Sequence, residues 1–127
     1  MAKSLKIQSA APVRSQAFNL DNGSGTTVDE ALLTAVVPLR IVRVYALYNE
    51  ATQTVAAGNF KLGASAGGAD YVAATAYENS KAVGAATQAT LVSDIVPAGT
   101  TLFVRHTGVA VTQTGTANIV VEFVYDE

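Results

Sequence analysis

The chain has 127 residues, half of them hydrophobic and 14% charged, with a formal net charge of −2. This composition excludes a disordered tail and argues against a nucleic-acid-binding protein, whose surface is normally strongly basic. Because there is no cysteine, disulfides and thiolate chemistry are excluded as well. The length fits one domain, but a core rich in alanine and valine buries little apolar area per residue. Subunit contacts are therefore an expected source of further stability.

The two ends of the chain carry opposite charge. The first twenty residues contain Lys3, Lys6 and Arg14 and no acid, whereas the last six contain acids and no base. A basic segment suits an arm that lies on an acidic neighbour, although solvated ends give the same pattern. We predict an extended N-terminal arm over residues 1–20 and a single β-sandwich domain over residues 21–127.

Neither a targeting segment nor a membrane span is expected. Residues 4–12 lack the apolar run of a secretory signal. Residues 31–47 are interrupted by Pro38, Arg40 and Arg43, and they fall short of the roughly 20 apolar residues that a span needs. The chain is accordingly expected to be made in the cytoplasm and to stay or assemble there.

Alternation of apolar and polar residues is the dominant pattern along the chain, and it is typical of half-buried strands. It occurs in stretches separated by Gly, Asn and Pro: residues 4–9, 39–49, 59–65, 87–96, 100–106 and 117–125. Short strands at this spacing predict an all-β fold, a sandwich or a barrel.

The two faces of residues 39–49 differ in character. The even positions make one apolar stripe, which we assign to the core: Val42, Val44, Ala46 and Tyr48. The odd positions are mixed and suit a second layer or a subunit contact: Ile41, Arg43, Tyr45 and Leu47. Arg43 and Tyr45 are therefore predicted interface residues, together with the basic residues of the arm, Lys3, Lys6 and Arg14.

For two stretches, the sequence pattern does not decide between a helix and a strand. Residues 26–37 carry a T-x-x-E capping box at 27–30, which suits a short helix, whereas the threonine and valines that follow fit a strand. Residues 70–84 have the alanine content of a helix but no sustained apolar face at helical spacing. Strand, turn and strand is the favoured interpretation of the second stretch.

His106 is the one histidine of the chain. It ends a stripe in which Leu102 and Val104 share its face of a predicted strand. A catalytic base needs a nucleophile and an orienting acid within reach, and the sequence contains no G-x-S-x-G motif. We predict a strand residue that is hydrogen-bonded within the fold or at a subunit boundary, and no catalytic residue.

No metal, cofactor or phosphate site is expected. One histidine and no cysteine exclude the common zinc patterns. The turn at residues 67–70 could offer oxygens to calcium, but it needs no ion to form. A sugar-binding platform would have to come from Tyr45, Tyr48, Tyr71, Tyr77 or Tyr125, because there is no tryptophan. Most of the tyrosines are assigned to the core or to an interface.

The chain resembles small jelly-roll proteins of tailed-bacteriophage virions in four stretches: RIVRVYALYNEAT, GNFKLGASAGGADYVAATAY, VPAGTTLFVRHTG and ANIVVEFVYDE. The resemblance implies an all-β fold, an antiparallel β-sandwich of jelly-roll-like form. It also implies the role of a capsid decoration, or cement, protein. Such a protein binds the outer surface of a phage capsid, typically as a trimer, and bridges neighbouring capsomers.

The implied partners are the major capsid protein and further copies of the chain, without nucleic acid, membrane or cofactor. The implied location is the capsid surface of the virion, and no enzymatic activity is expected. The arm and the loops around residues 22–27 and 64–70 are the expected capsid-facing parts. Two other classes stay open: a receptor- or glycan-binding module at a fibre or tail tip, and an enzyme on a β-scaffold.

Overall fold

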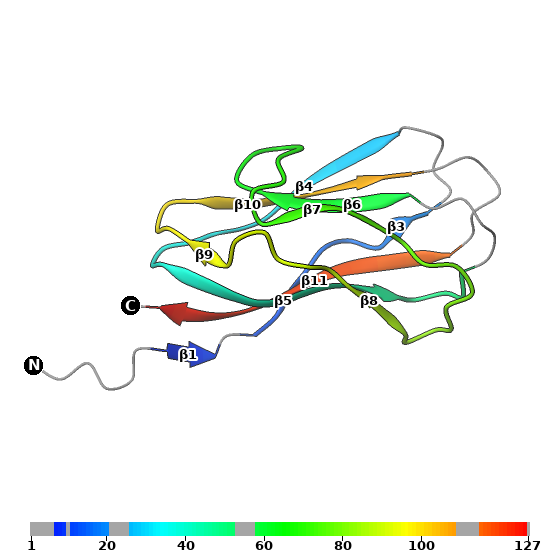
Figure 1. Ribbon diagram of the computed structural model, residues 1–127, viewed down its shortest axis with the longest axis horizontal. Coiled ribbons are helices and arrows are strands. Elements are labelled where there is room, and N and C mark those ends of the chain that lie inside the picture. Colours follow the sequence, from blue (N-terminus) through cyan, green and yellow to red (C-terminus); the bar gives the residue numbers. More distant parts are fainter. Residues whose placement is uncertain (1–6, 10, 21–25, 53–57, 109–114, 127) are drawn as a thin grey trace, which may run out of the picture.

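The computed structural model is a sandwich of two antiparallel sheets (Figure 1). It describes residues 7–9, 11–20, 26–52, 58–108 and 115–126. The predicted all-β fold is confirmed, and the described residues contain no helix long and apolar enough to cross a membrane.

The strands in chain order are β1 (Ile7–Ser9), β2 (Val13–Arg14), β3 (Phe18–Asn19), β4 (Thr27–Thr34), β5 (Leu39–Tyr48), β6 (Asn59–Gly63), β7 (Val72–Ala76), β8 (Ala86–Gln88), β9 (Ile95–Val96), β10 (Thr101–Thr107) and β11 (Thr116–Asp126).

The strand order is that of a jelly roll. In the larger sheet, β11 pairs with β5 on one side and with the short β1, β2 and β3 on the other, while β8 and β9 follow one another along the far edge of β5. The smaller sheet has the order β4-β10-β6-β7. Apart from the β6–β7 pair, the chain changes sheets at each step from β3 onward, counting β8 and β9 as one strand. The jelly-roll-like antiparallel sandwich is therefore confirmed.

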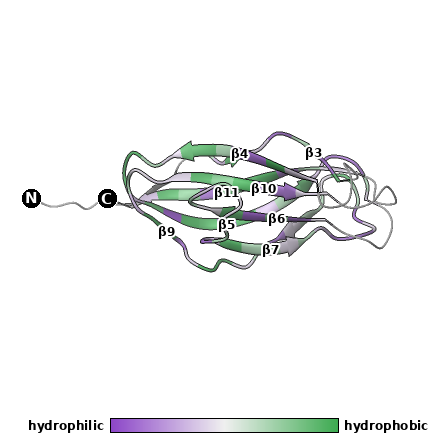
Figure 2. Cartoon of the chain, turned by 90° about the horizontal axis from the view of Figure 1, so that it is seen from above, coloured by the Kyte–Doolittle hydropathy of each residue, from purple (hydrophilic) through white to green (hydrophobic). Residues whose placement is uncertain are grey.

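Alternation places one side of each main strand in the core. In β10, Leu102, Val104 and His106 are buried while the residues between them are partly exposed. Phe60 and Leu62 of β6 are buried in the same way. Figure 2 shows hydrophobic and hydrophilic residues following one another along the strands. The apolar stripes predicted for these two strands are confirmed.

A β-bulge in β5 shifts the stripe predicted for that strand. Glu122 of β11 faces Arg43 and the next residue, Phe123, faces Ile41, so Val42 is an extra residue in β5. Such an insertion turns one additional side chain outward. The core assignment was wrong for Val42, which is 55% exposed, whereas Val44 and the even positions after it are buried. Ile41, assigned to the mixed face, is buried instead.

The structure settles the two open stretches. Thr27–Thr34 is the edge strand β4, not a helix, and the Glu30 carboxylate accepts a hydrogen bond from the backbone N–H of Gln16. Residues 70–84 contain β7 followed by a turn, and the second strand predicted there is absent, because the next strand, β8, begins at Ala86. The strand predicted over 87–96 is interrupted, because Leu91 and Val92 cross to bond with the smaller sheet and leave only β8 and β9 on β5.

The described part of the predicted arm lies along β11 of the same chain. Phe18 and Leu20 are buried in the core. The Ser15 backbone N–H donates to the carbonyl of Ile119 at 2.9 Å, and the Ser15 hydroxyl accepts from the N–H of Ile119 at 2.8 Å. Residues 13–20 of the predicted arm therefore belong to the sandwich and complete its larger sheet.

Leu20→Ala should lower the free energy of unfolding by about 2–5 kcal/mol, because it opens a cavity in a fully buried site. Chemical denaturation measures this change. Val36→Ala, at a position 88% exposed, is the control and should change stability by less than about 0.5 kcal/mol. An effect of Leu20→Ala as small as that of the control would contradict the docking of residues 13–20.

Candidate interaction face

Three of the predicted interface residues come together on the outer face of the larger sheet. Tyr45 of β5 lies opposite Val120 of β11, and Val120 in turn lies opposite Arg14 of β2. Arg43 is two residues before Tyr45 and points to the same side. The other two predicted residues, Lys3 and Lys6, lie outside the described part of the chain.

Glu122 organises this face. Its carboxylate accepts hydrogen bonds from Arg43 Nε at 3.1 Å and from Arg43 Nη2 at 2.8 and 2.9 Å. The Tyr45 hydroxyl donates to the same carboxylate at 3.1 Å, and the Arg43 guanidinium lies 5.4 Å from the centre of the Tyr45 ring. Partial burial and this hydrogen bond raise the pKa of Tyr45. The arginine and the phenol are thus held in fixed positions while Arg43 stays 48% exposed.

Glu122 was not recognised as a site residue from the sequence. The sequence feature that marks Glu122 is weak, since it is an acidic residue within an otherwise apolar strand. Glu122 and Arg43 are far apart in the chain, and only the register of β5 against β11 brings them together. The bulge at Val42 also contributes, because it sets which β5 side chains stand beside Glu122.

A shallow hollow of about 180 Å³ adjoins the cluster on its β8 side, lined by Arg43, Tyr45, Ala86 and Gln88. The hollow lies beside the part of β5 between its pairing with β9 and its pairing with β8. The segment that connects β8 to β9 leaves β5 there and crosses to the smaller sheet. Val42 and Ile95 are exposed hydrophobic residues near this stretch. The face therefore combines fixed donors, an aromatic edge and apolar surface.

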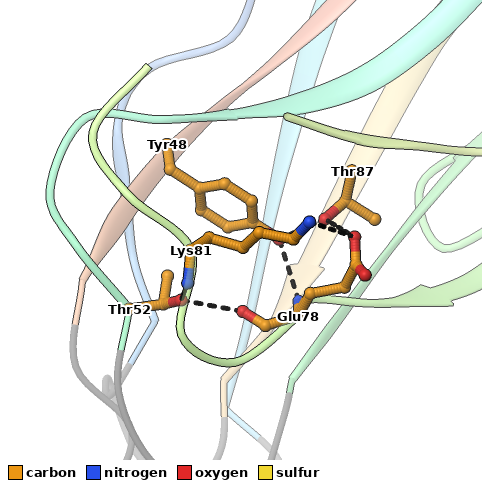
Figure 3. Close-up of polar contacts among 5 residues, drawn as sticks. All are labelled: Tyr48, Thr52, Glu78, Lys81 and Thr87. Atoms are coloured by element: carbon orange, nitrogen blue, oxygen red, sulfur yellow. Dashed lines mark hydrogen bonds and ion pairs between the residues drawn. The ribbon is translucent and has the colours of Figure 1, made fainter. Parts of the chain in front are cut away.

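A clamp of polar contacts fixes β8, the far wall of the hollow (Figure 3). The Thr87 hydroxyl, on the inner side of β8, hydrogen-bonds to the Tyr48 hydroxyl and donates to the Glu78 carboxylate at 2.6 Å. Glu78 is also tied through its backbone to Tyr48 and Thr52, and its side chain lies 3.6 Å from the Lys81 ammonium. Because Thr87 is anchored inward, its neighbours in β8 keep their outward positions.

The smaller sheet carries a similar arginine pair, but its own loop covers that pair. Arg105 donates from Nε and Nη2 to the Asp29 carboxylate at 2.7 and 2.8 Å, which lowers the pKa of Asp29. The turn at residues 64–70 folds against this guanidinium so closely that a Cβ at Gly67 would lie 2.7 Å from Arg105 Cζ. Gly67 and Gly68 thus pack on their own sheet, while the other residues of 64–70, the loop expected to face a capsid, are exposed.

His106 is a buried strand residue, as predicted. Its Nε2 faces the backbone carbonyl of Asn19 at 3.1 Å, so this nitrogen carries the proton. Nδ1 must then accept the 2.8 Å hydrogen bond from the Tyr77 hydroxyl. Phe18 stacks on the imidazole with ring centres 4.9 Å apart. Burial lowers the pKa of His106 to about 4, so the ring is neutral at pH 7 and joins the N-terminal segment to the smaller sheet.

Of the five tyrosines considered for a sugar platform, Tyr48, Tyr71 and Tyr77 are in the core, whereas Tyr45 is partly exposed and Tyr125 is exposed. Tyr71 and Tyr77 are buried, and the Tyr77 hydroxyl is engaged by His106. Within the described ranges, no group of three His, Asp or Glu side chains is placed to hold a metal ion. The outer face of the larger sheet is therefore the candidate functional site.

Stability should fall in mild acid because of His106. Its pKa is about 4 in the folded protein and about 6.5 when unfolded, so the unfolded chain binds the proton more readily. The free energy of unfolding should decrease as pH drops from 6.5 to 4, by about 3 kcal/mol in total. Denaturation at a series of pH values measures this. In His106→Gln the loss over that range should be much smaller, and an unchanged slope would contradict the assignment.

Thr87→Val should lower the free energy of unfolding by about 1–2 kcal/mol, because the buried Tyr48 hydroxyl loses a partner and the exposed Glu78 carboxylate loses its hydrogen bond to β8. The matched control is Thr90→Val, at an exposed threonine of the same segment, which should have little effect. Thermal and urea denaturation compare the two variants. Equal effects would show that the clamp does not stabilise β8.

Comparison with known protein families, curated proteins and solved structures finds no match for this chain. The chain is thus identified by its fold, an antiparallel β-sandwich with the strand order of a jelly roll, and by the fixed arginine–tyrosine cluster on its larger sheet.

Proposed function

We propose that the protein is a structural virion protein that binds the outer surface of a bacteriophage capsid and bridges neighbouring capsomers, as a trimer. The observation that carries the proposal is the outer face of the larger sheet. There the fold fixes Arg43 and Tyr45 against Glu122 and leaves both side chains accessible. Arginine and tyrosine side chains held rigidly at a surface are typical anchors of protein–protein interfaces.

Several features favour a binding role of this kind over catalysis or sugar recognition. The histidine has both ring nitrogens engaged inside the core. Three of the five tyrosines considered for sugar recognition, Tyr48, Tyr71 and Tyr77, are buried. The outer face of the larger sheet is broad, and its hollow is shallow, which suits contact with another protein surface more than it suits enclosure of a small molecule.

The trimer is proposed on the basis of exposed apolar surface. Val36, Val83 and Val92 are all more than half exposed. Contacts between copies would cover such residues and add to a core made largely of small side chains. A trimer that attaches through several equivalent faces also binds far more tightly than one copy, because each attached copy raises the effective concentration of the others.

Two measurements test this function. Light scattering after size-exclusion chromatography should give three times the mass of one chain. The purified protein should also co-sediment with heads of the phage that encodes it, and should leave heads of an unrelated phage in the unbound fraction. A monomer that does not bind the cognate heads, but binds glycans on an array, would contradict the proposal and support the receptor-binding alternative.

A further inference from the structure

We propose that the hollow lined by Arg43, Tyr45, Ala86 and Gln88 is a binding site for an acidic side chain, aspartate or glutamate, of a partner protein. The inference rests on the proposed function in one respect, since it takes the partner on the virion to be a capsid surface. The chemistry of the site is argued from the chain itself.

The first argument compares two bidentate arginine pairs of the described part of the chain, one on each sheet. Arg105 pairs with Asp29 on the smaller sheet, and the turn at Gly67 lies directly over its guanidinium. Arg43 pairs with Glu122 on the larger sheet, and the space beside it is the hollow. The side chain of Arg43 is 48% exposed, against 29% for Arg105. The chain covers one pair itself and leaves the other open to a partner.

The second argument is the set of free donors. Glu122 occupies Nε and Nη2 of Arg43, and no described residue accepts a hydrogen bond from Nη1. Gln88 adds an exposed side-chain amide across the hollow. A carboxylate is the group that an arginine nitrogen and an amide N–H bind best together.

The third argument is charge. Arg14 lies on the same outer face as Tyr45 and Arg43, across β11 from Tyr45. Its guanidinium adds a local positive charge that the Arg43–Glu122 pair does not cancel, although the chain as a whole carries a net charge of −2. A local field of this sign attracts a carboxylate and orients it before contact.

The test uses a hexaglutamate peptide as the probe and follows the full-length protein by NMR chemical-shift titration at low salt. The wild-type protein should show its largest shifts at residues 43, 45 and 86–88. Arg43→Ala should weaken binding about tenfold, as expected for loss of a charged hydrogen bond. Arg43→Lys, which keeps the charge but loses the fork of donors, should give a smaller loss.

The matched control is Arg105→Ala, which removes the similar pair on the other sheet and should change the affinity by less than about twofold. The proposal is overturned if the two alanine variants lose affinity equally, or if Arg43→Ala binds as the wild type does. Unfolding curves of each variant confirm that the fold is retained, and Arg43→Lys serves if Arg43→Ala fails to fold.

The same variants separate this proposal from the proposed function. If the protein binds the peptide through Arg43 but does not bind cognate phage heads, the capsid role is overturned and the carboxylate site is supported. If Arg43→Ala binds cognate heads as tightly as the wild type does, the capsid role is supported, but the hollow is not the capsid contact.

Discussion

The pairing of β5 with β11, including the bulge at Val42, determines which side chains enter the core and which form the outer face of the larger sheet. Before the bulge Leu39 and Ile41 point inward, and after it Val44 and the next two alternate residues do so. A regular strand would turn one of these two groups outward, because alternation has a period of two residues. The same extra residue places Val42 and Arg43 together on the outer side, beside Glu122. One local irregularity thus allows a continuous core and a charged cluster on the same strand.

Contacts on both sides of the β5–β11 pair fix the position of the outer face. On the β11 side, residues 13–20 complete the sheet and carry Phe18 into the core, where it stacks on His106. On the β8 side, Thr87 is tied inward to Tyr48 and Glu78. Side chains supported in this way lose little conformational freedom when a partner binds, and that loss is a main cost of association. The buried polar contacts therefore matter to the proposed function although they lie beneath the face.

Much of the fold was predictable from alternation. The strands at residues 59–63, 101–107 and 116–126 match the predicted stretches 59–65, 100–106 and 117–125, and His106 was recognised as a strand residue. The bulge was not predictable, because nothing in the local pattern distinguishes Val42 from its neighbours. The break between β8 and β9 arises from contacts with the other sheet, which no window of sequence contains. Arg14, Arg43 and Tyr45 were singled out individually, whereas Glu122, which holds two of them, required the register of β5 on β11.

The proposed capsid role makes the larger sheet the attached face and leaves the smaller sheet, with Arg105 under its own loop, directed outward. A cryo-electron microscopy reconstruction of cognate phage heads mixed with the purified protein tests this most directly. The account predicts density for three copies around a symmetry or pseudo-symmetry axis, with β5, β8 and β11 against the capsid and an acidic capsid side chain at Arg43. Density in which β4, β10 and β6 face the capsid, or heads without added density, would contradict it.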